Sequence, residues 1–133
     1  MFKYAEMKKI LDENIPETLT LDKYTETKQF WSDEEIPIYC YYETLEHLFL
    51  KLLNKEIIND ELLNRVLDFM EDMANSEDVD VQNLLEVQIL EALFGLDYNI
   101  FHNMETKLFR PRTKELFNHA RQFFNEPLHP SEK

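Results

Sequence analysis

Apolar residues recur every three to four positions along most of the chain, which is the spacing of one face of an α-helix. Six segments carry this pattern and no strand-like alternation exceeds four residues, so we expect an all-α fold of about five to six helices. The helices should form a single compact domain over residues 1–124, as an irregular bundle or a short array of helical hairpins. Residues 125–133, with Pro127 and Pro130, are predicted to be a flexible C-terminal tail.

The start of the chain predicts one helix followed by an ambiguous segment. A helix is expected over residues 2–13, where Tyr4, Met7 and Leu11 share a face. Residues 14–31 fit the alternation of a strand and also the face of a helix. The sequence leaves their structure open.

The second helix is predicted to start at Ser32 and to continue to about residue 54. Ser32 and Glu35 have the spacing of a capping box, and Trp31 and Ile36 have that of a hydrophobic staple. Pro37 falls in the first turns of this helix, where proline can distort it. A broad apolar face follows and predicts a helix that contributes to the core.

The third helix is expected to begin with Asn59 or Asp60 as its N-cap and to separate two faces completely. Its inner arc is apolar, from Leu62 to Ala74. Its outer arc is polar and mostly acidic, comprising Asp60, Glu61, Asn64, Arg65, Asp68, Glu71 and Asp72. The pattern predicts a surface helix with an acidic outer face.

The fourth helix, over residues 81–94, is apolar almost all round and is predicted to lie at the centre of the fold. Asp78 or Asp80 should cap its start, and Gly95 should follow its end. Gln88 and Glu91 fall among its apolar residues, and a buried carboxylate needs a partner. We therefore predict that Glu91 pairs with an arginine of the C-terminal third, which offers three candidates: Arg110, Arg112 and Arg121.

Two further helices are expected near the C-terminus. One starts at Asp97, and Pro111 separates it from the other. The last helix carries a narrow apolar stripe made of Leu116, Phe117, Ala120, Phe123 and Phe124. We expect a monomer or a small homodimer.

Composition excludes several classes of protein. Cys40 is the only cysteine, so no intramolecular disulfide is possible, and we expect a cytoplasmic protein. Neither a signal peptide nor an apolar stretch of about 18 residues is recognisable, so no membrane span is predicted. The single glycine, Gly95, is too few for a glycine-rich phosphate loop.

Charge is distributed unevenly along the chain. The net charge is −13, yet residues 101–133 carry 6 basic and 4 acidic side chains. Between Lys55 and Lys107 the only basic residue is Arg65, against 13 carboxylates. Such a field repels nucleic acid and anionic membranes and attracts basic protein surfaces.

No motif in the sequence indicates catalysis or metal binding, and we expect no cofactor. The segment starting at Asp78 fails as a calcium loop because Asn83 and Ile89 replace the required glycine and glutamate. Glu43, Glu46 and His47 lack the spacing of a helical-bundle metal site, and Cys40 lacks a recognisable base. The alternative is an enzyme or metal-binding helical protein whose site forms only in three dimensions.

The strongest candidate for a functional surface is the acidic stretch that starts on the third helix. It comprises Asp60, Glu61, Asp68, Glu71, Asp72, Glu77, Asp78 and Asp80. The simpler interpretation of this stretch is a solvated helix face. The functional interpretation is a surface that binds a basic protein.

Residues 78–87, which include the motif Asn-Leu-Leu-Glu-Val, and the later Glu91-Ala92-Leu93 resemble a motif in small helical bacterial proteins. Some of those proteins are similar to immunity proteins of bacterial toxin systems, and the resemblance covers about residues 60–124. It implies a non-enzymatic module that neutralises a toxin. Together with the acidic stretch, it predicts an inhibitor that docks onto a basic toxin surface, such as a nuclease active site.

Overall fold

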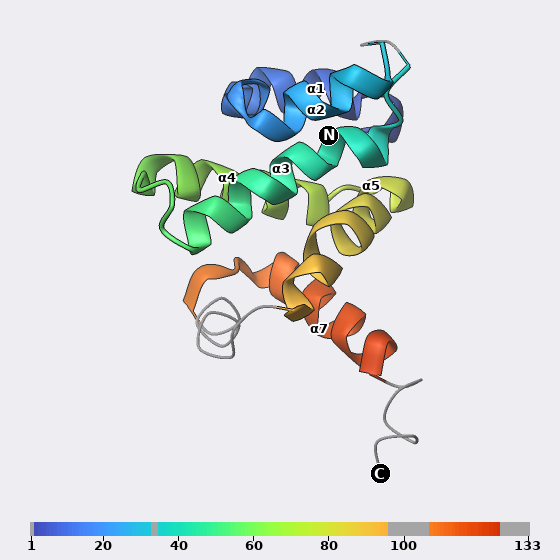
Figure 1. Cartoon of the computed structure of the whole chain (residues 1–133). Helices are drawn as coiled ribbons and strands as arrows, with labels where there is room; N and C mark the ends of the chain where they lie inside the picture. Colours follow the sequence, from blue (N-terminus) through green and yellow to red (C-terminus); the bar gives the residue numbers. More distant parts are fainter. Residues whose placement is uncertain (1, 33–34, 96–106, 126–133) are drawn as a thin grey trace.

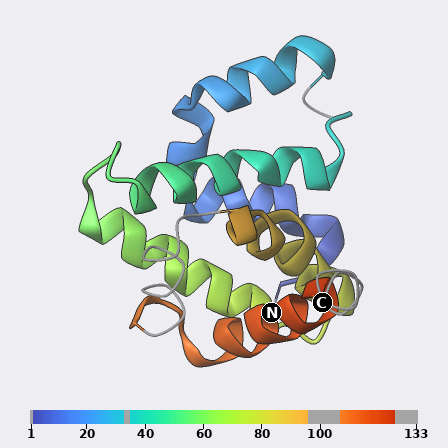
Figure 2. The ribbon, with the colours of Figure 1, turned by 60° about the horizontal axis from the view of Figure 1, so that its bottom comes forward.

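The computed structural model describes residues 2–32, 35–95 and 107–125. Every regular element within these ranges is a helix, so the predicted all-α class is confirmed. In Figure 1 the elements follow one another from α1 and α2 at the top to α7 at the bottom, and α3 crosses between α2 and α4. In Figure 2, α3 again lies between α2 and α4.

The first predicted helix is confirmed. Its first turn is a 3₁₀ turn, η1 (Tyr4–Glu6), which leads into the α-helix α1 (Met7–Asn14). The segment that the sequence left open is also helical. It forms η2 (Pro16–Thr20) and then α2 (Asp22–Phe30). Threonine hydroxyls explain the strand-like pattern before α2: Thr18 and Thr20 each donate to the carbonyl three residues earlier, so these β-branched residues stabilise a tight turn.

The predicted start of the second helix at Ser32 is wrong, because α3 (Ile38–Leu53) begins six residues later. Pro37 is its N-cap with extended backbone, and proline also disfavours helical backbone in the residue before it. The Glu35 N–H donates to the backbone carbonyl of Ser32 at 2.9 Å. The capping-box spacing therefore marks a turn before the helix.

Tyrosines on α3 fix it to α1. The hydroxyl of Tyr42, which is fully buried, donates to the carbonyl of Met7 at 2.7 Å. The neighbouring Tyr41 donates to Asp12 at 2.5 Å. The apolar face of α3 thus carries two polar contacts at fixed places, which set how α1 lies across it.

Helix α4 (Asp60–Ala74) agrees closely with its prediction. The Asn59 side chain accepts the N–H of Leu62 at 3.0 Å, as an N-cap does. The inner face is buried, with Val66, Met70 and Met73 at 0% exposure. The two faces separate as the pattern predicted.

The predicted central helix is divided into three segments: α5 (Val79–Leu84), a π-helical segment η3 (Leu85–Leu90), and a 3₁₀ turn η4 (Glu91–Gly95). Each hydrogen-bonded turn of a π-helix contains one more residue than a turn of an α-helix. A helical wheel drawn for an α-helix therefore assigns the wrong faces to residues in and after η3. Val87, which the wheel placed on the apolar side, is 50% exposed. Gly95 ends η4 and does not lie beyond it.

The last helix, α7 (Pro111–Asn125), packs against α4 and η3, as Figure 2 shows. Phe117 is buried between Phe94 and Phe109, with ring centroids 5.4 and 5.1 Å away. The predicted apolar stripe is confirmed at three residues, Leu116, Phe117 and Ala120.

Several predictions fall outside what the structure describes. They are the helix from Asp97, the tail after residue 125, and the side chains of Phe123 and Phe124. Within the described ranges, no helix is both long and apolar enough to cross a membrane.

Candidate functional site

Four carboxylates of the predicted acidic stretch lie exposed along the outer side of α4: Asp60, Glu61, Asp68 and Asp72. We call them the α4 acidic face. Two arginines border it. Arg65 contacts Glu17 on η2 and Glu61, while Arg110, just before α7, reaches Asp68 at 3.2 Å. These exposed ion pairs neutralise part of the face.

Asp72 lies on this face next to other carboxylates of its own helix. Burial raises its pKa, and the neighbouring carboxylates of Asp68 and Glu71 raise it further. Beside it is a hollow of about 160 Å³, lined by Asn14, Ile15, Arg65, Asp68, Phe69 and Asp72. Negative charge is thus concentrated beside this hollow, where the cationic group of a binding partner would be stabilised.

Glu71 has a different role from the one expected, because it binds the start of α7. Its carboxylate accepts the backbone N–H groups of Arg112 at 3.0 Å and Thr113 at 2.8 Å, and the Thr113 hydroxyl at 2.9 Å. Burial acts to raise the Glu71 pKa, but these hydrogen bonds outweigh it and the pKa is lowered. Glu71 therefore serves as a cap supplied by another helix.

Asp78 is also tied to the fold, whereas its acidic neighbours are exposed. One Asp78 oxygen caps α5 by accepting the N–H of Asp80 at 3.0 Å, as the sequence predicted. The other accepts the N–H of Tyr4 at 2.9 Å, which holds the N-terminal segment. Glu77 and Asp80 are exposed, so these two remain accessible to a partner.

Two of the three proposed partners of Glu91, Arg110 and Arg112, contact other carboxylates. Arg110 reaches Asp68, Arg112 reaches Glu115 at 2.7 Å, and Arg121 lies partly exposed on α7. Glu91 is partly buried, as expected, and burial together with the charge of Glu86 raises its pKa. Its pairing with an arginine stays a prediction.

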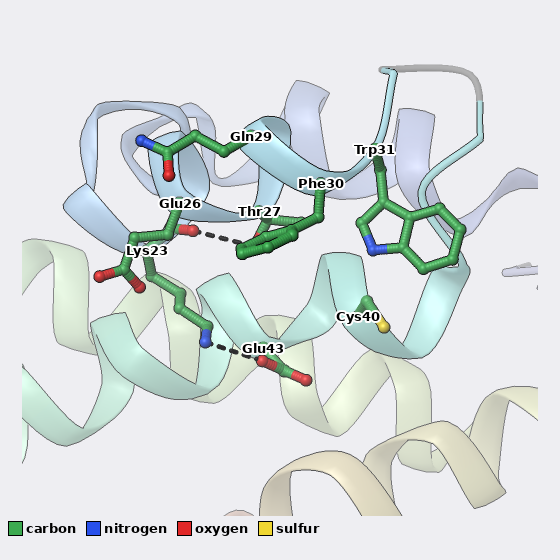
Figure 3. A pocket seen from close by; sticks show the side chains of 8 residues that line it. All are labelled: Lys23, Glu26, Thr27, Gln29, Phe30, Trp31, Cys40 and Glu43. Carbon is green, nitrogen blue, oxygen red and sulfur yellow. Dashed lines mark hydrogen bonds and ion pairs between the residues drawn. The ribbon is translucent and has the colours of Figure 1, made fainter.

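A groove between α2 and α3 has a volume of about 440 Å³, larger than that of the hollow beside Asp72. Figure 3 shows the side chains of Phe30 and Trp31 extending from the end of α2 over α3, where Cys40 and Glu43 lie. Phe30 is 83% exposed and Trp31 is 40% exposed. The remaining lining residues are Lys23, Glu26, Thr27 and Gln29. We call this hollow the α2–α3 groove.

One cation and several carboxylates meet at the α2–α3 groove. Lys23 contacts Glu43 at 3.0 Å, and this contact raises the Lys23 pKa, with Glu26 and Glu46 adding to it. Glu46 is half-buried, which raises its pKa, and it accepts a hydrogen bond from Gln88 on η3 at 2.9 Å. Gln88 is thus partly buried with a polar partner.

Sequence reasoning missed the groove because its two walls come from separate helices. The available signal was the pair of adjacent aromatic residues after a helix of weak amphipathic character, Asp22–Phe30. Cys40 lines the groove, and the described lining contains no histidine. Among the described residues, no three His, Cys, Asp or Glu side chains are grouped so as to hold a metal ion.

Comparison with known families finds one match. The profile of DUF7674, a domain of unknown function, matches residues 8–125, and the chain belongs to this family. No curated protein and no solved structure matches the chain.

Proposed function

We propose that this DUF7674 protein is a non-enzymatic module that binds a basic protein through the α4 acidic face. In its most specific form, the proposal is an immunity-type inhibitor that neutralises a bacterial toxin in the cytoplasm. The observation that carries it is the exposure of Asp60, Glu61, Asp68 and Asp72 along one helix of a well-packed domain.

The state of Asp72 supports the choice of a basic partner. Its pKa is raised by burial and by Asp68 and Glu71, so its charged form is less stable here than in an isolated aspartate. A lysine or arginine of a partner entering the adjacent hollow would stabilise that charge. A field of this sign also speeds the encounter with a basic surface, in addition to strengthening the complex.

Only some carboxylates of the predicted acidic stretch are suited to binding a basic partner. Glu71 and Asp78 bind backbone N–H groups of their own chain, so their substitution would disturb the fold. Glu77 and Asp80 are exposed beyond the end of α4 and can extend the binding surface. The test variants therefore change Asp68 and Asp72 and leave Glu71 in place.

A growth assay tests the proposal. The genes next to the gene for this chain are expressed one at a time in a host that lacks it. We expect one of them to arrest growth and co-expression of the wild-type chain to restore growth. The double variant Asp68→Lys/Asp72→Lys should not restore it.

The matched control is Asp22→Lys/Glu35→Lys, which makes the same change in net charge at two exposed positions, the start of α2 and the segment between α2 and α3. This control should protect as the wild type does. With the purified toxin, the α4 variant should associate roughly tenfold more slowly at low salt. Arrest by none of the genes, or equal protection by both variants, contradicts the proposal.

A further inference from the structure

The α2–α3 groove combines features of a binding site for one side chain or a small ligand. Its volume of about 440 Å³ lies within the range of ligand pockets. Phe30 and Trp31 lie next to each other on its wall, and they are two of the five large apolar side chains that are exposed among the described residues. Exposed aromatic side chains at the edge of a hollow are typical of interaction sites.

The charges that line the groove favour a cationic ligand. Among the described residues, Lys23 is the only cation that lines the groove, and it already contacts Glu43 at 3.0 Å. Glu26 also lines the groove, and Glu46 lies close enough to act on Lys23. The cation thus faces three carboxylates, which leaves an excess of negative charge beside two aromatic faces. Aromatic faces attract cations as well.

We propose that the α2–α3 groove binds an arginine side chain of a basic polypeptide, with the guanidinium stacked on Phe30 or Trp31 and hydrogen-bonded to Glu43 or Glu26. Arginine fits better than lysine because its planar group stacks on a ring and donates to a carboxylate at the same time. A phosphate or carboxylate ligand would meet the carboxylates that already surround Lys23.

This inference is independent of the α4 acidic face. In both Figure 1 and Figure 2, α3 lies between α2 and α4, so the groove and the face are formed on different parts of the fold. At physiological salt, charges interact over about 8 Å, and a change on α4 should leave the groove unaffected. The two proposals can therefore fail separately.

The binding experiment uses Trp31, the single tryptophan of the chain, as a reporter within the groove. The probes are an acetylated and amidated Gly-Arg-Gly peptide, the same peptide with lysine, and the same peptide with citrulline, which has the shape of arginine without its charge. Binding is followed by the indole N–H signal in NMR and by fluorescence at 0.15 M salt. We expect the arginine peptide to bind with a Kd on the order of 1 mM and the citrulline peptide at least roughly tenfold more weakly.

Substitutions in the groove sharpen the test. Phe30→Ala and Glu26→Gln should each weaken arginine binding by roughly threefold to tenfold. Lys23→Met should strengthen it by about threefold, because Glu43 loses its resident cation. Glu115→Gln, an exposed carboxylate on α7, and Asp68→Lys/Asp72→Lys are controls that should bind as the wild type does.

Three outcomes would overturn the proposal. They are no binding of the arginine peptide, equal binding of the citrulline peptide, and weaker binding by Lys23→Met. The last outcome would show that Lys23 supports the bound side chain and does not compete with it for Glu43. Circular dichroism of each variant shows that the fold is intact, since the substituted residues are exposed or partly exposed.

Discussion

Glu71 and Asp72 are neighbours on α4, but they belong to different surroundings. Glu71 turns toward α7 and accepts two backbone N–H groups and a hydroxyl, so its charge is held by the fold and its pKa is lowered. Asp72 lies on the exposed side among like charges, and its pKa is raised by burial, Asp68 and Glu71. One carboxylate joins two helices, and the other is available to bind a partner.

The difference shows what a helical wheel omits. A wheel separates apolar from polar positions, and it did so correctly for α4. It does not distinguish a carboxylate that meets another helix from one that meets water, because that depends on a segment about 40 residues away, the start of α7 at Pro111.

The largest effect is expected for Glu71→Ala. This change removes the acceptor of two N–H groups at the start of α7 and of the Thr113 hydroxyl, whose residue is 1% exposed. We expect the free energy of unfolding to fall by about 2–3 kcal/mol, measured by urea denaturation. The control is Asp60→Ala, at an exposed position on the same helix. An equal fall in the free energy of unfolding there would contradict the special role of Glu71.

A smaller effect is expected for Asp78→Ala, which loses the cap of α5 and the bond to the N–H of Tyr4. The free energy of unfolding should fall by about 1–2 kcal/mol. Hydrogen exchange should become faster at the Tyr4 amide in particular. Asp80→Ala should leave that amide protected, and equal exchange in both variants would argue against the contact.

The smallest expected effect is on the pH dependence of stability, where Glu71 and Asp72 should act in opposite directions. Because the pKa of Glu71 is lowered, its ionised carboxylate stabilises the folded state at pH values above its ordinary pKa of 4.5. This stabilisation is lost as the pH falls below that value and through the lowered pKa. The raised pKa of Asp72 means the reverse, since ionisation above its ordinary value of 3.8 destabilises the folded state. At pH 7, Glu71→Gln should therefore destabilise and Asp72→Asn should stabilise slightly, by a few tenths of a kcal/mol after solvent screening. Chemical denaturation between pH 3 and pH 7 checks both signs, and destabilisation by Asp72→Asn would contradict the account.

The sequence was sufficient where the cause of a structure is local. The Asn59 and Asp78 caps, the faces of α4 and the start of α7 at Pro111 all follow from neighbouring residues. It was insufficient where local signals compete, as at Ser32, where a capping-box spacing is overruled by Pro37. The α2–α3 groove could not be predicted because no local pattern shows which helices meet.

The π-helical segment Leu85–Leu90 has a consequence for how this family can vary in length. A π-turn is the trace of one residue inserted into an α-helix. Restoring a regular α-helical ladder without removing a residue would rotate everything downstream by about 100° around the helix axis, because each α-helical residue turns by that angle. Leu93, now fully buried, would then leave the interior. The π-turn accommodates one additional residue while Leu93 stays buried, so relatives that keep this core should either keep the π-turn or lack one residue there.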